Sequence, residues 1–403
     1  MEDALTGVRV VDFSWGAAGP YATMLLAIMG AEVIRVETVT HLDLMRVTMD
    51  PVTRVPLDPE LSLLNQVVNL NKLGIRLNLT KPEAVELAKN LVKVSDIVVE
   101  SYRPGVMANL GLSYSILKEI KPDIIMLSTS AAGSTGPEAH SLGLAPLFAA
   151  LGGLGELTGY SDGPPTEIRF TIDLMCAVTN AFAILAALNH RLRTGQGQFI
   201  DVSSREEISC LIGDSLLDYI MNGQTQSRDG NRDDIMAPHN CYRCKGEDKW
   251  ISIAISNEEE WRVFCQAIEH LEWIEAERFF DAHGRWQNQD ELDRLVEQWT
   301  LGHTAYEAME ILQKAGVAAF PSLNAEELFT DPHTNARELF QVVEHPKRGA
   351  CVLLSPPWKL SATPPRITRH GPLLGEHNRY VFHDILGMSL DEVAELEDKK
   401  VIY

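Results

Sequence analysis

The sequence predicts an α/β protein in which an open, doubly wound sheet is followed by a smaller second domain. Short apolar strands alternate with helical segments over about the first 130 residues, which is typical of a parallel sheet covered by helices. After about residue 225 the composition changes, because residues 224–234 are polar and contain glycine, as linkers often do. Residues 249–256 then have a strand pattern, and helical patterns follow it. We therefore place the smaller domain at about residues 225–325.

The first repeat combines a strand, a tight turn, a helix and a second strand. Residues 7–13 have the apolar pattern of a buried strand, and the turn after it contains Gly16. Pro20 suits the first turn of the following helix, and Gly30 suits the position just past its end. Residues 31–37 then form the second strand. This order predicts a βαβ unit with two parallel strands.

Two further helix–strand pairs extend the sheet. Helices are expected at about residues 82–94 and 114–120, and each precedes a short apolar strand. In doubly wound sheets, ligands bind at the carboxyl ends of the strands. Those ends are residues 14–18, residue 37, residues 101–103 and residues 130–136.

The bulk composition excludes several classes of partner. The chain has 35 basic and 56 acidic side chains and a net charge of −21, so nucleic acid and anionic membranes are not expected as partners. Six cysteines in 403 residues do not make a disulfide framework. The N-terminus lacks the pattern of a secretory signal, so we expect a cytoplasmic protein.

Two patterns that could indicate a cofactor or metal site are incomplete. The turn at Gly16 lacks the G-x-G-x-x-G pattern of nicotinamide and flavin sites. Cys241 and Cys244 form one C-x-x-C with His239 nearby, but no second pair supplies the fourth ligand of a zinc site. We therefore expect no metal and no permanently bound cofactor.

Asp173 stands just before a long apolar helix, expected over residues 174–193. The apolar part is short and interrupted by polar residues, which favours a buried helix over a membrane span. A carboxylate at a helix N-terminus is stabilised by free N–H groups and the helix dipole. The residues alone leave two interpretations of Asp173 open, a helix N-cap or a desolvated nucleophile.

Several segments, in order along the first half of the chain, resemble the class III CoA-transferases of the formyl-CoA transferase type. The second half matches in layout more than in motif. The matching segments include Leu5-Thr-Gly-Val-Arg-Val-Val-Asp-Phe, Gly30-Ala-Glu-Val-Ile-Arg-Val-Glu37, Asn69-Leu-Asn-Lys72, Val99-Glu-Ser-Tyr-Arg-Pro-Gly105 and Thr194-Gly-Gln-Gly-Gln198-Phe-Ile-Asp-Val202.

The resemblance implies a fold and a reaction. The fold would be a Rossmann-like large domain built from residues 1–224 and 326–403, with a small domain of residues 225–325, in an interlocked dimer. The position matching the family's nucleophilic aspartate is Asp173. The reaction would move CoA from an acyl-CoA to a free carboxylic acid through an aspartyl-CoA thioester, with the CoA thioester as substrate.

The resemblance also assigns CoA contacts by motif position. These are Trp15, Gly16, Ala17, Ala18, Lys72, Tyr102 and Arg103. Positive charge for the phosphates is expected from Arg46, Lys72, Arg76 and Arg103.

The chain departs from the family pattern at Thr38, Asn109 and Ala132, where the family pattern has a basic residue, an arginine and an aromatic residue, respectively. Small side chains at Ala132 and Ala145 predict room for a bulky aromatic or branched acyl group. The stretch from residue 237 to residue 251 resembles the benzylsuccinate CoA-transferase branch, which pairs two related subunits.

Two alternative functions are weighed against CoA transfer. The α-methylacyl-CoA racemases share the fold and the aspartate, but their Gly-His-Asp motif is Gly143-Leu144-Ala145 here, so one of two proton carriers is missing. A partner subunit of a heteromeric CoA-transferase is the third interpretation, and the retained Asp173 argues against a purely structural role.

Overall fold

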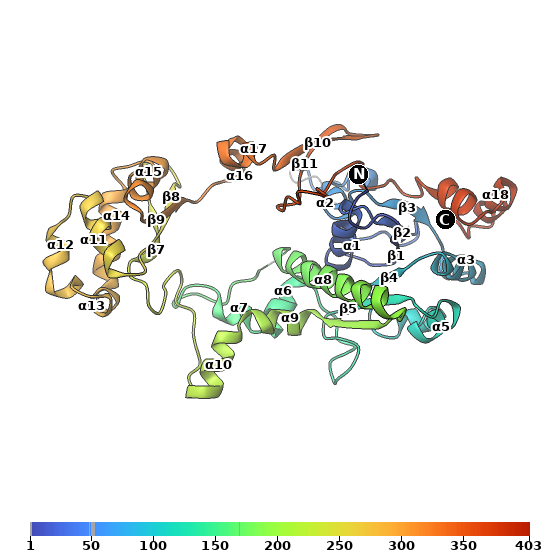
Figure 1. The fold of residues 1–403 in the computed structure, drawn as a ribbon, viewed down its shortest axis with the longest axis horizontal. Coiled ribbons are helices and arrows are strands. Elements are labelled where there is room, and N and C mark those ends of the chain that lie inside the picture. The colour runs from blue at the N-terminus through green and yellow to red at the C-terminus, as the bar shows by residue number, and fades with distance from the viewer. Residues whose placement is uncertain (1, 48, 50–52, 169) are drawn as a thin grey trace. The chain divides into compact units, whose positions relative to one another are not determined.

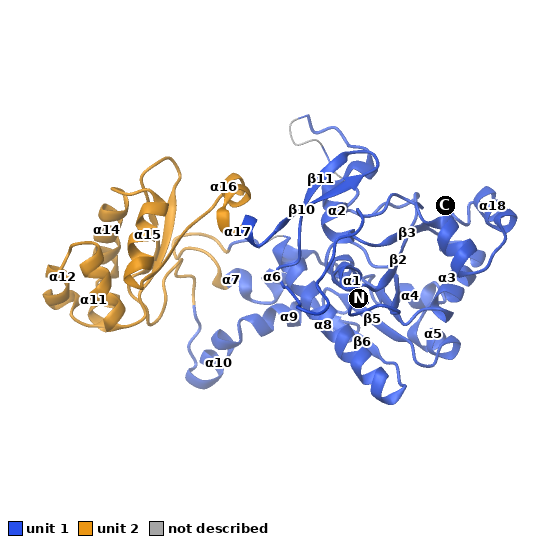
Figure 2. Ribbon diagram, turned by 45° about the horizontal axis from the view of Figure 1, so that its top comes forward, with its two compact units in different colours: residues 1–156, 166–226, 335–403 blue, residues 157–165, 227–334 orange. Residues whose placement is uncertain are grey.

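The computed structural model describes residues 2–47, 49, 53–168 and 170–403. The chain divides into two compact units (Figure 2). Unit 1 comprises residues 1–156, 166–226 and 335–403, and unit 2 comprises residues 157–165 and 227–334. The limits of unit 2 therefore differ from the expected 225–325 at both ends, and it includes a short earlier segment.

Unit 1 is built on a six-stranded parallel sheet (Figure 1). The strand order is β3-β2-β1-β4-β5-β6, and each neighbouring pair is parallel. This order is that of a Rossmann-like fold and confirms the predicted fold class. The strands are β1 (Arg9–Asp12), β2 (Glu32–Glu37), β3 (Leu73–Arg76), β4 (Ile97–Glu100), β5 (Ile125–Ser130) and β6 (Phe199–Ser203).

Helices cover both faces of this sheet. Successive residues of a strand point to opposite faces, so each strand contributes side chains to two cores. Val10 belongs to the core shared with α1 (Ala18–Ile28) and α8 (Thr171–Thr194). Val11 belongs to the core on the other face. That face is covered by α3 (Pro82–Lys93), α5 (Tyr114–Ile120), the π-helix η3 (Tyr380–Ile385) and α18 (Leu390–Asp398).

The proline-rich sequence from residue 345 onward predicts an extended tail, and the C-terminal segment of the structure differs from this. It opens with an antiparallel hairpin of β10 (Phe340–His345) and β11 (Gly349–Leu354). Val343, Cys351 and Leu353 are buried in a cluster with residues of α1. The proline pairs follow the hairpin in irregular structure. The spacing of Ser389 and Glu392 in the sequence predicts a capping box, and the structure confirms it at the start of α18.

The remaining elements of unit 1 are short. They are η1 (Pro59–Leu61), α2 (Leu63–Asn69), α4 (Val106–Asn109), α6 (Ala145–Leu151), α9 (Ser204–Leu211) and α10 (Gly213–Asn222). Two helices cross a unit limit, α7 (Leu154–Leu157) and α17 (Pro332–Ala336).

Unit 2 has a core of its own around Trp261, Phe264 and Phe279. Its sheet is antiparallel, with β8 (Trp250–Ala254) between β7 (His239–Arg243) and β9 (Ala318–Pro321). Its helices are α11 (Glu258–Ala267), α12 (Glu272–Glu275), η2 (Glu277–Phe279), α13 (Ala282–Gln287), α14 (Gln289–Thr300), α15 (Ala305–Ala315) and α16 (Ala325–Thr330).

Candidate active site

A cleft of about 210 Å³ opens at the carboxyl ends of β1, β4 and β5. β1 and β4 are neighbours from which the chain continues in opposite directions, and open α/β sheets bind ligands at such a switch point. All the predicted CoA contacts except Lys72 line this cleft, together with Asp173. The complete lining is residues 15–18, 44, 101–104, 129–131, 141–144, 148, 173 and 204.

Asp173 is the third residue of α8, within its first turn. The expectation that it precedes the helix is therefore wrong, and the N-cap position is held by Phe170. The helix begins earlier because Ile172 is fully buried and anchors the first turn against Phe148 and Ile208. In the first turn, backbone N–H groups have no partner within the helix, so the carboxylate lies close to free donors.

The carboxyl group of Asp173 is desolvated. Burial raises its pKa to about 6. Across the described part of the chain, no hydrogen bond or ion pair joins the Asp173 side chain to another residue. An ionised carboxylate without a cationic partner and with little water is a stronger nucleophile than a solvated one.

The turn after β1 is held by hydrogen bonds to two other segments of the chain. The backbone N–H of Trp15 donates to Ser101 Oγ at 2.7 Å, and that hydroxyl donates to the carbonyl oxygen of Trp15 at 2.9 Å. The N–H of Gly16 donates to Asp43 Oδ1 at 3.2 Å. The Trp15 ring stacks on His41, with 4.6 Å between ring centroids. These contacts fix the turn over the cleft.

Gly19 is required where this turn enters α1. A Cβ atom added at Gly19 would lie 2.4 Å from Cβ of Ser14. Ser14 is itself held by Asp12, which accepts from the Ser14 N–H at 2.9 Å. Any larger residue at position 19 would therefore displace the turn.

Lys72 does not reach the cleft. Its side chain is fully buried, and Nζ lies 2.8 Å from Asp12 Oδ2, 2.8 Å from Asn69 Oδ1 and 2.7 Å from the Pro20 carbonyl oxygen. Burial lowers its pKa to about 8, against the opposing effect of Asp12. The prediction that Lys72 contacts CoA does not fit this geometry, because all three ammonium protons have acceptors within the protein.

Arg46 and Arg76 also lie outside the cleft lining. Arg46 is buried and donates to both carboxylate oxygens of Glu37, at 2.7 and 2.6 Å. Arg76 Nη2 lies 3.6 Å from Glu397. Of the four cations expected to hold phosphates, Arg103 alone lines the cleft; its side chain is exposed, with no hydrogen bond or ion pair to any described residue.

The carboxyl end of β4 contributes a second perturbed acid. Burial raises the pKa of Glu100 to about 7, and Glu100 Oε2 accepts from the Tyr102 N–H at 2.7 Å. Burial also raises the pKa of the Tyr102 hydroxyl, with Glu100 adding to the effect. Glu100 thus orients the turn that carries Tyr102 and Arg103.

Several lining residues were missed by the sequence analysis. Leu44, Leu142, Phe148 and Ser204 carry no motif, and only their placement in the fold brings them to the cleft. Ala132 and Ala145 do not line it, so the expected room for a bulky acyl group does not come from those positions.

No metal-binding cluster of three or more His, Cys, Asp or Glu side chains occurs within the described ranges. α8 is long and apolar enough to cross a membrane by length and composition alone, with 44% of its most apolar window buried. It packs against α1 and β5 in unit 1, as the core helix of a folded domain does.

Comparison with known proteins gives concordant results. The sequence pattern of CoA-transferase family III matches residues 5–378. The chain is 35% identical over 399 residues to a succinyl-CoA–D-citramalate CoA-transferase of Chloroflexus aurantiacus, covering 99% of this chain and 98% of the relative. It is 32% identical over 400 residues to the alpha subunit of a succinyl-CoA–L-malate CoA-transferase of the same species, covering 99% and 92%.

A solved structure shows the same architecture. The crystal structure of a CAIB/BAIF family protein from Brucella suis superposes with a TM-score of 0.85 at 27% identity, covering 96% of this chain and 100% of that one. The match of the family pattern across nearly the whole sequence agrees with this superposition. The chain is therefore an enzyme that belongs to CoA-transferase family III.

Proposed function

We propose that this enzyme moves CoA from an acyl-CoA to a free carboxylic acid by using Asp173 as the nucleophile. The observation that carries the proposal is a single desolvated carboxylate, with a pKa raised to about 6, facing the cleft at the sheet's switch point. At neutral pH this group is mostly ionised and able to attack a thioester.

The reaction has two symmetrical halves. A carboxylate oxygen of Asp173 attacks the donor thioester carbonyl, forms a mixed anhydride and releases CoA thiolate. The thiolate then attacks the Asp173 acyl carbon, which gives an aspartyl-CoA thioester and frees the donor acid. In the second half the acceptor carboxylate attacks this thioester and releases the thiolate again. The thiolate finally attacks the acceptor's acyl carbon, so that Asp173 returns as a carboxylate.

Each half passes through tetrahedral oxyanions that need hydrogen-bond donors. The free N–H groups in the first turn of α8 lie beside Asp173, and Ser130 and Ser204 are among the residues that line the same cleft. Fixed donors in a water-poor site stabilise such charges strongly. Arg103, whose guanidinium has no protein partner among the described residues, is the cation we assign to a CoA phosphate.

Racemisation of a 2-methylacyl-CoA is less well supported. That reaction needs two proton carriers on opposite sides of one carbon atom. Among the described residues, the cleft lining contains no histidine, aspartate or glutamate apart from Asp173, and Gly143 and Leu144 occupy the matching stretch. CoA transfer needs no second proton carrier.

The acids remain to be assigned by assay. Two relatives are named for transfer from succinyl-CoA, to D-citramalate and to L-malate, so succinyl-CoA is the first donor to test. The benzylsuccinate branch and the aromatic or branched acyl group stay predictions, and benzylsuccinate belongs in the acceptor panel.

The test is an exchange assay. The protein is incubated with succinyl-CoA and each acid of the panel, and the new acyl-CoA is followed by liquid chromatography. We expect a new CoA ester that forms only with acceptor present and that Asp173→Asn abolishes. Inversion of a 2-methylacyl-CoA without any acceptor acid would overturn the proposal in favour of the racemase. Activity that appears only after a related chain is added would support the heteromeric alternative.

A further inference from the structure

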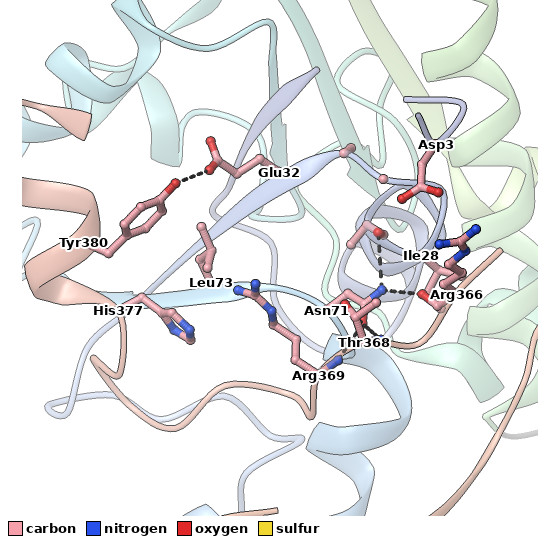
Figure 3. A pocket seen from close by; sticks show the side chains of 13 residues that line it. Asp3, Ile28, Glu32, Asn71, Leu73, Arg366, Thr368, Arg369, His377 and Tyr380 are labelled. Atoms are coloured by element: carbon pink, nitrogen blue, oxygen red, sulfur yellow. Dashed lines mark hydrogen bonds between the residues drawn. The ribbon is translucent and has the colours of Figure 1, made fainter. Parts of the chain in front are cut away.

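A larger cavity, of about 630 Å³, is shown in Figure 3. It lies at the opposite end of the strands from the cleft. Its walls come from the end of α1, the first residues of β2 and β3, and the C-terminal segment between residues 366 and 380. These are the amino ends of the strands, whereas the candidate active site lies at the carboxyl ends. The volume is within the range of small-molecule sites.

Hydrogen bonds through Asn71 fix the C-terminal wall of this cavity. The side-chain amide of Asn71 donates to the Arg366 carbonyl oxygen at 2.6 Å. Its Oδ1 atom accepts from the Thr368 N–H at 2.8 Å and from the Arg369 N–H at 3.1 Å. The Arg366 N–H donates to the carbonyl oxygen of Ile28 at 3.1 Å. The backbone that carries both arginines is therefore held before any ligand binds.

The guanidinium groups of Arg366 and Arg369 have no hydrogen bond or ion pair to any residue in the described part of the chain. Figure 3 shows the Arg369 side chain extending toward Leu73 and His377. Of the two acids in the lining, Glu32 is paired with Arg9 and accepts from the Tyr380 hydroxyl at 2.9 Å. The other acid, Asp3, lies on the Arg366 side of the cavity in Figure 3, and no ion pair joins Asp3 to Arg366 among the described residues.

His377 adds a neutral donor to the same wall. Its Nδ1 atom accepts from the Gly74 N–H at 3.1 Å, so the proton of the neutral ring is on Nε2. Burial lowers the pKa of His377 against the opposing effect of Glu376, and nearby Arg369 acts in the same direction as burial, so the ring is neutral at physiological pH. The Nε2–H group has no acceptor among the residues described.

From this arrangement we infer that unit 1 has a second, non-catalytic site for a small anion that carries phosphate or carboxylate groups. Two arginines present donor forks that match the oxygens of either group. The chain's net charge of −21 disfavours the binding of anions in general. Two guanidinium groups without protein partners make this wall of the cavity locally positive. The inference does not depend on CoA transfer or on Asp173.

The test is calorimetric titration of the full-length protein with inorganic pyrophosphate and, separately, with succinate. The variants are Arg366→Gln and Arg369→Gln, with Arg379→Gln as the matched control, because Arg379 is exposed on the same segment but does not line the cavity. Each variant removes one positive charge, so a general charge effect would be equal in all three. Thermal unfolding checks that each variant is folded.

We expect saturable binding that weakens about tenfold in R366Q and in R369Q and is unchanged in R379Q, in line with the strength of charge-assisted hydrogen bonds. Binding of pyrophosphate alone would identify a phosphate ligand, and binding of succinate alone a carboxylate ligand. No saturable binding of either anion would overturn the inference. Equal weakening in all three variants, or no weakening in R366Q and R369Q, would also overturn it.

Discussion

At the scale of single residues, the environment of Asp173 decides the chemistry. Its pKa is raised by burial rather than by a neighbouring charge, so the group is neutral in acid and ionised at neutral pH. The sequence predicted this residue from the apolar helix and the order of the motifs. It did not predict that the helix begins three residues earlier, at Thr171, because the burial of Ile172 depends on tertiary contacts.

The raised pKa predicts a pH profile for catalysis. If the Asp173 carboxylate is the nucleophile, kcat/KM for acyl-CoA falls as pH decreases through about 6, along a limb that reports one proton. Steady-state rates between pH 5 and 8 measure this limb. A limb centred near the ordinary aspartate value of 3.8 would contradict the desolvation of Asp173.

The same shift predicts that Asp173→Asn stabilises the fold. A carboxyl group whose folded pKa lies above its unfolded pKa costs stability when it ionises; the cost is absent below the unfolded value of 3.8 and complete above about pH 6. We expect the variant's free energy of unfolding at pH 8 to exceed the wild-type value by up to about 3 kcal/mol. Urea unfolding at pH 8 and pH 4.5 should show the difference shrinking at the lower pH, and a less stable variant at pH 8 would contradict it.

Lys72 shows the limit of residue-scale prediction. A lysine in a motif does not reveal which way its side chain points. The signal that was available is Asp12, a carboxylate in an apolar strand that needs a buried cation as partner. Reading those two residues as a pair would have placed Lys72 inside the protein.

At the scale of elements, the turn between β1 and α1 is positioned by the segment after β2. Asp43 is fully buried, pairs with Arg35 and accepts from the Gly16 N–H. β1, β2, β4 and β5 were predicted because their apolar runs are continuous, whereas the short strand β3 was not predicted. The hairpin of β10 and β11 was not, because its exposed face also carries Val342, Val352 and Leu354, which obscures the alternation.

Asp43 variants separate the positioning of this turn from overall stability. Asp43→Ala removes both the charge beside Arg35 and the acceptor for Gly16, whereas Asp43→Asn keeps an acceptor oxygen. We expect both to lower the free energy of unfolding, by about 3 kcal/mol for the alanine, and only the alanine to raise KM for acyl-CoA severalfold. Steady-state kinetics and urea unfolding measure the two effects.

Ser389→Ala is the control for these variants. It removes the cap of α18, far along the chain from the cleft, and should cost about 1 kcal/mol with KM unchanged. If KM rises equally in Asp43→Asn and Asp43→Ala, the hydrogen bond to Gly16 does not position the turn.

At the scale of the whole molecule, the C-terminal part of the chain belongs to unit 1, the same unit as the N-terminal part. Val381, Phe382, Val401 and Ile402 lie in the same core as the strands of the sheet. Composition and periodicity alone predicted a tail here. The return was expected only from the family resemblance, because pairing between distant chain ends leaves no local pattern.

The same scale includes assembly. One side of α8 exposes Val178, Phe182 and Leu192, with exposed fractions of 56%, 71% and 77%. A row of large apolar side chains on a core helix is costly in water and favours burial against another chain. We predict that the chain forms a dimer, at twice its mass of 44.7 kDa, when purified alone. Light scattering after size-exclusion chromatography measures this, and a monomer that pairs only with a related chain would instead favour a heteromer.

The central claim is that Asp173 forms a covalent intermediate, the aspartyl-CoA thioester, and one trapping experiment tests it directly. The protein is incubated with succinyl-CoA without acceptor, the adduct is reduced with borohydride or cleaved with hydroxylamine, and the modified peptide is sequenced by mass spectrometry. We predict modification at Asp173 alone, and none in Asp173→Ala. Modification at another residue, or full transfer activity in Asp173→Ala, would contradict the mechanism.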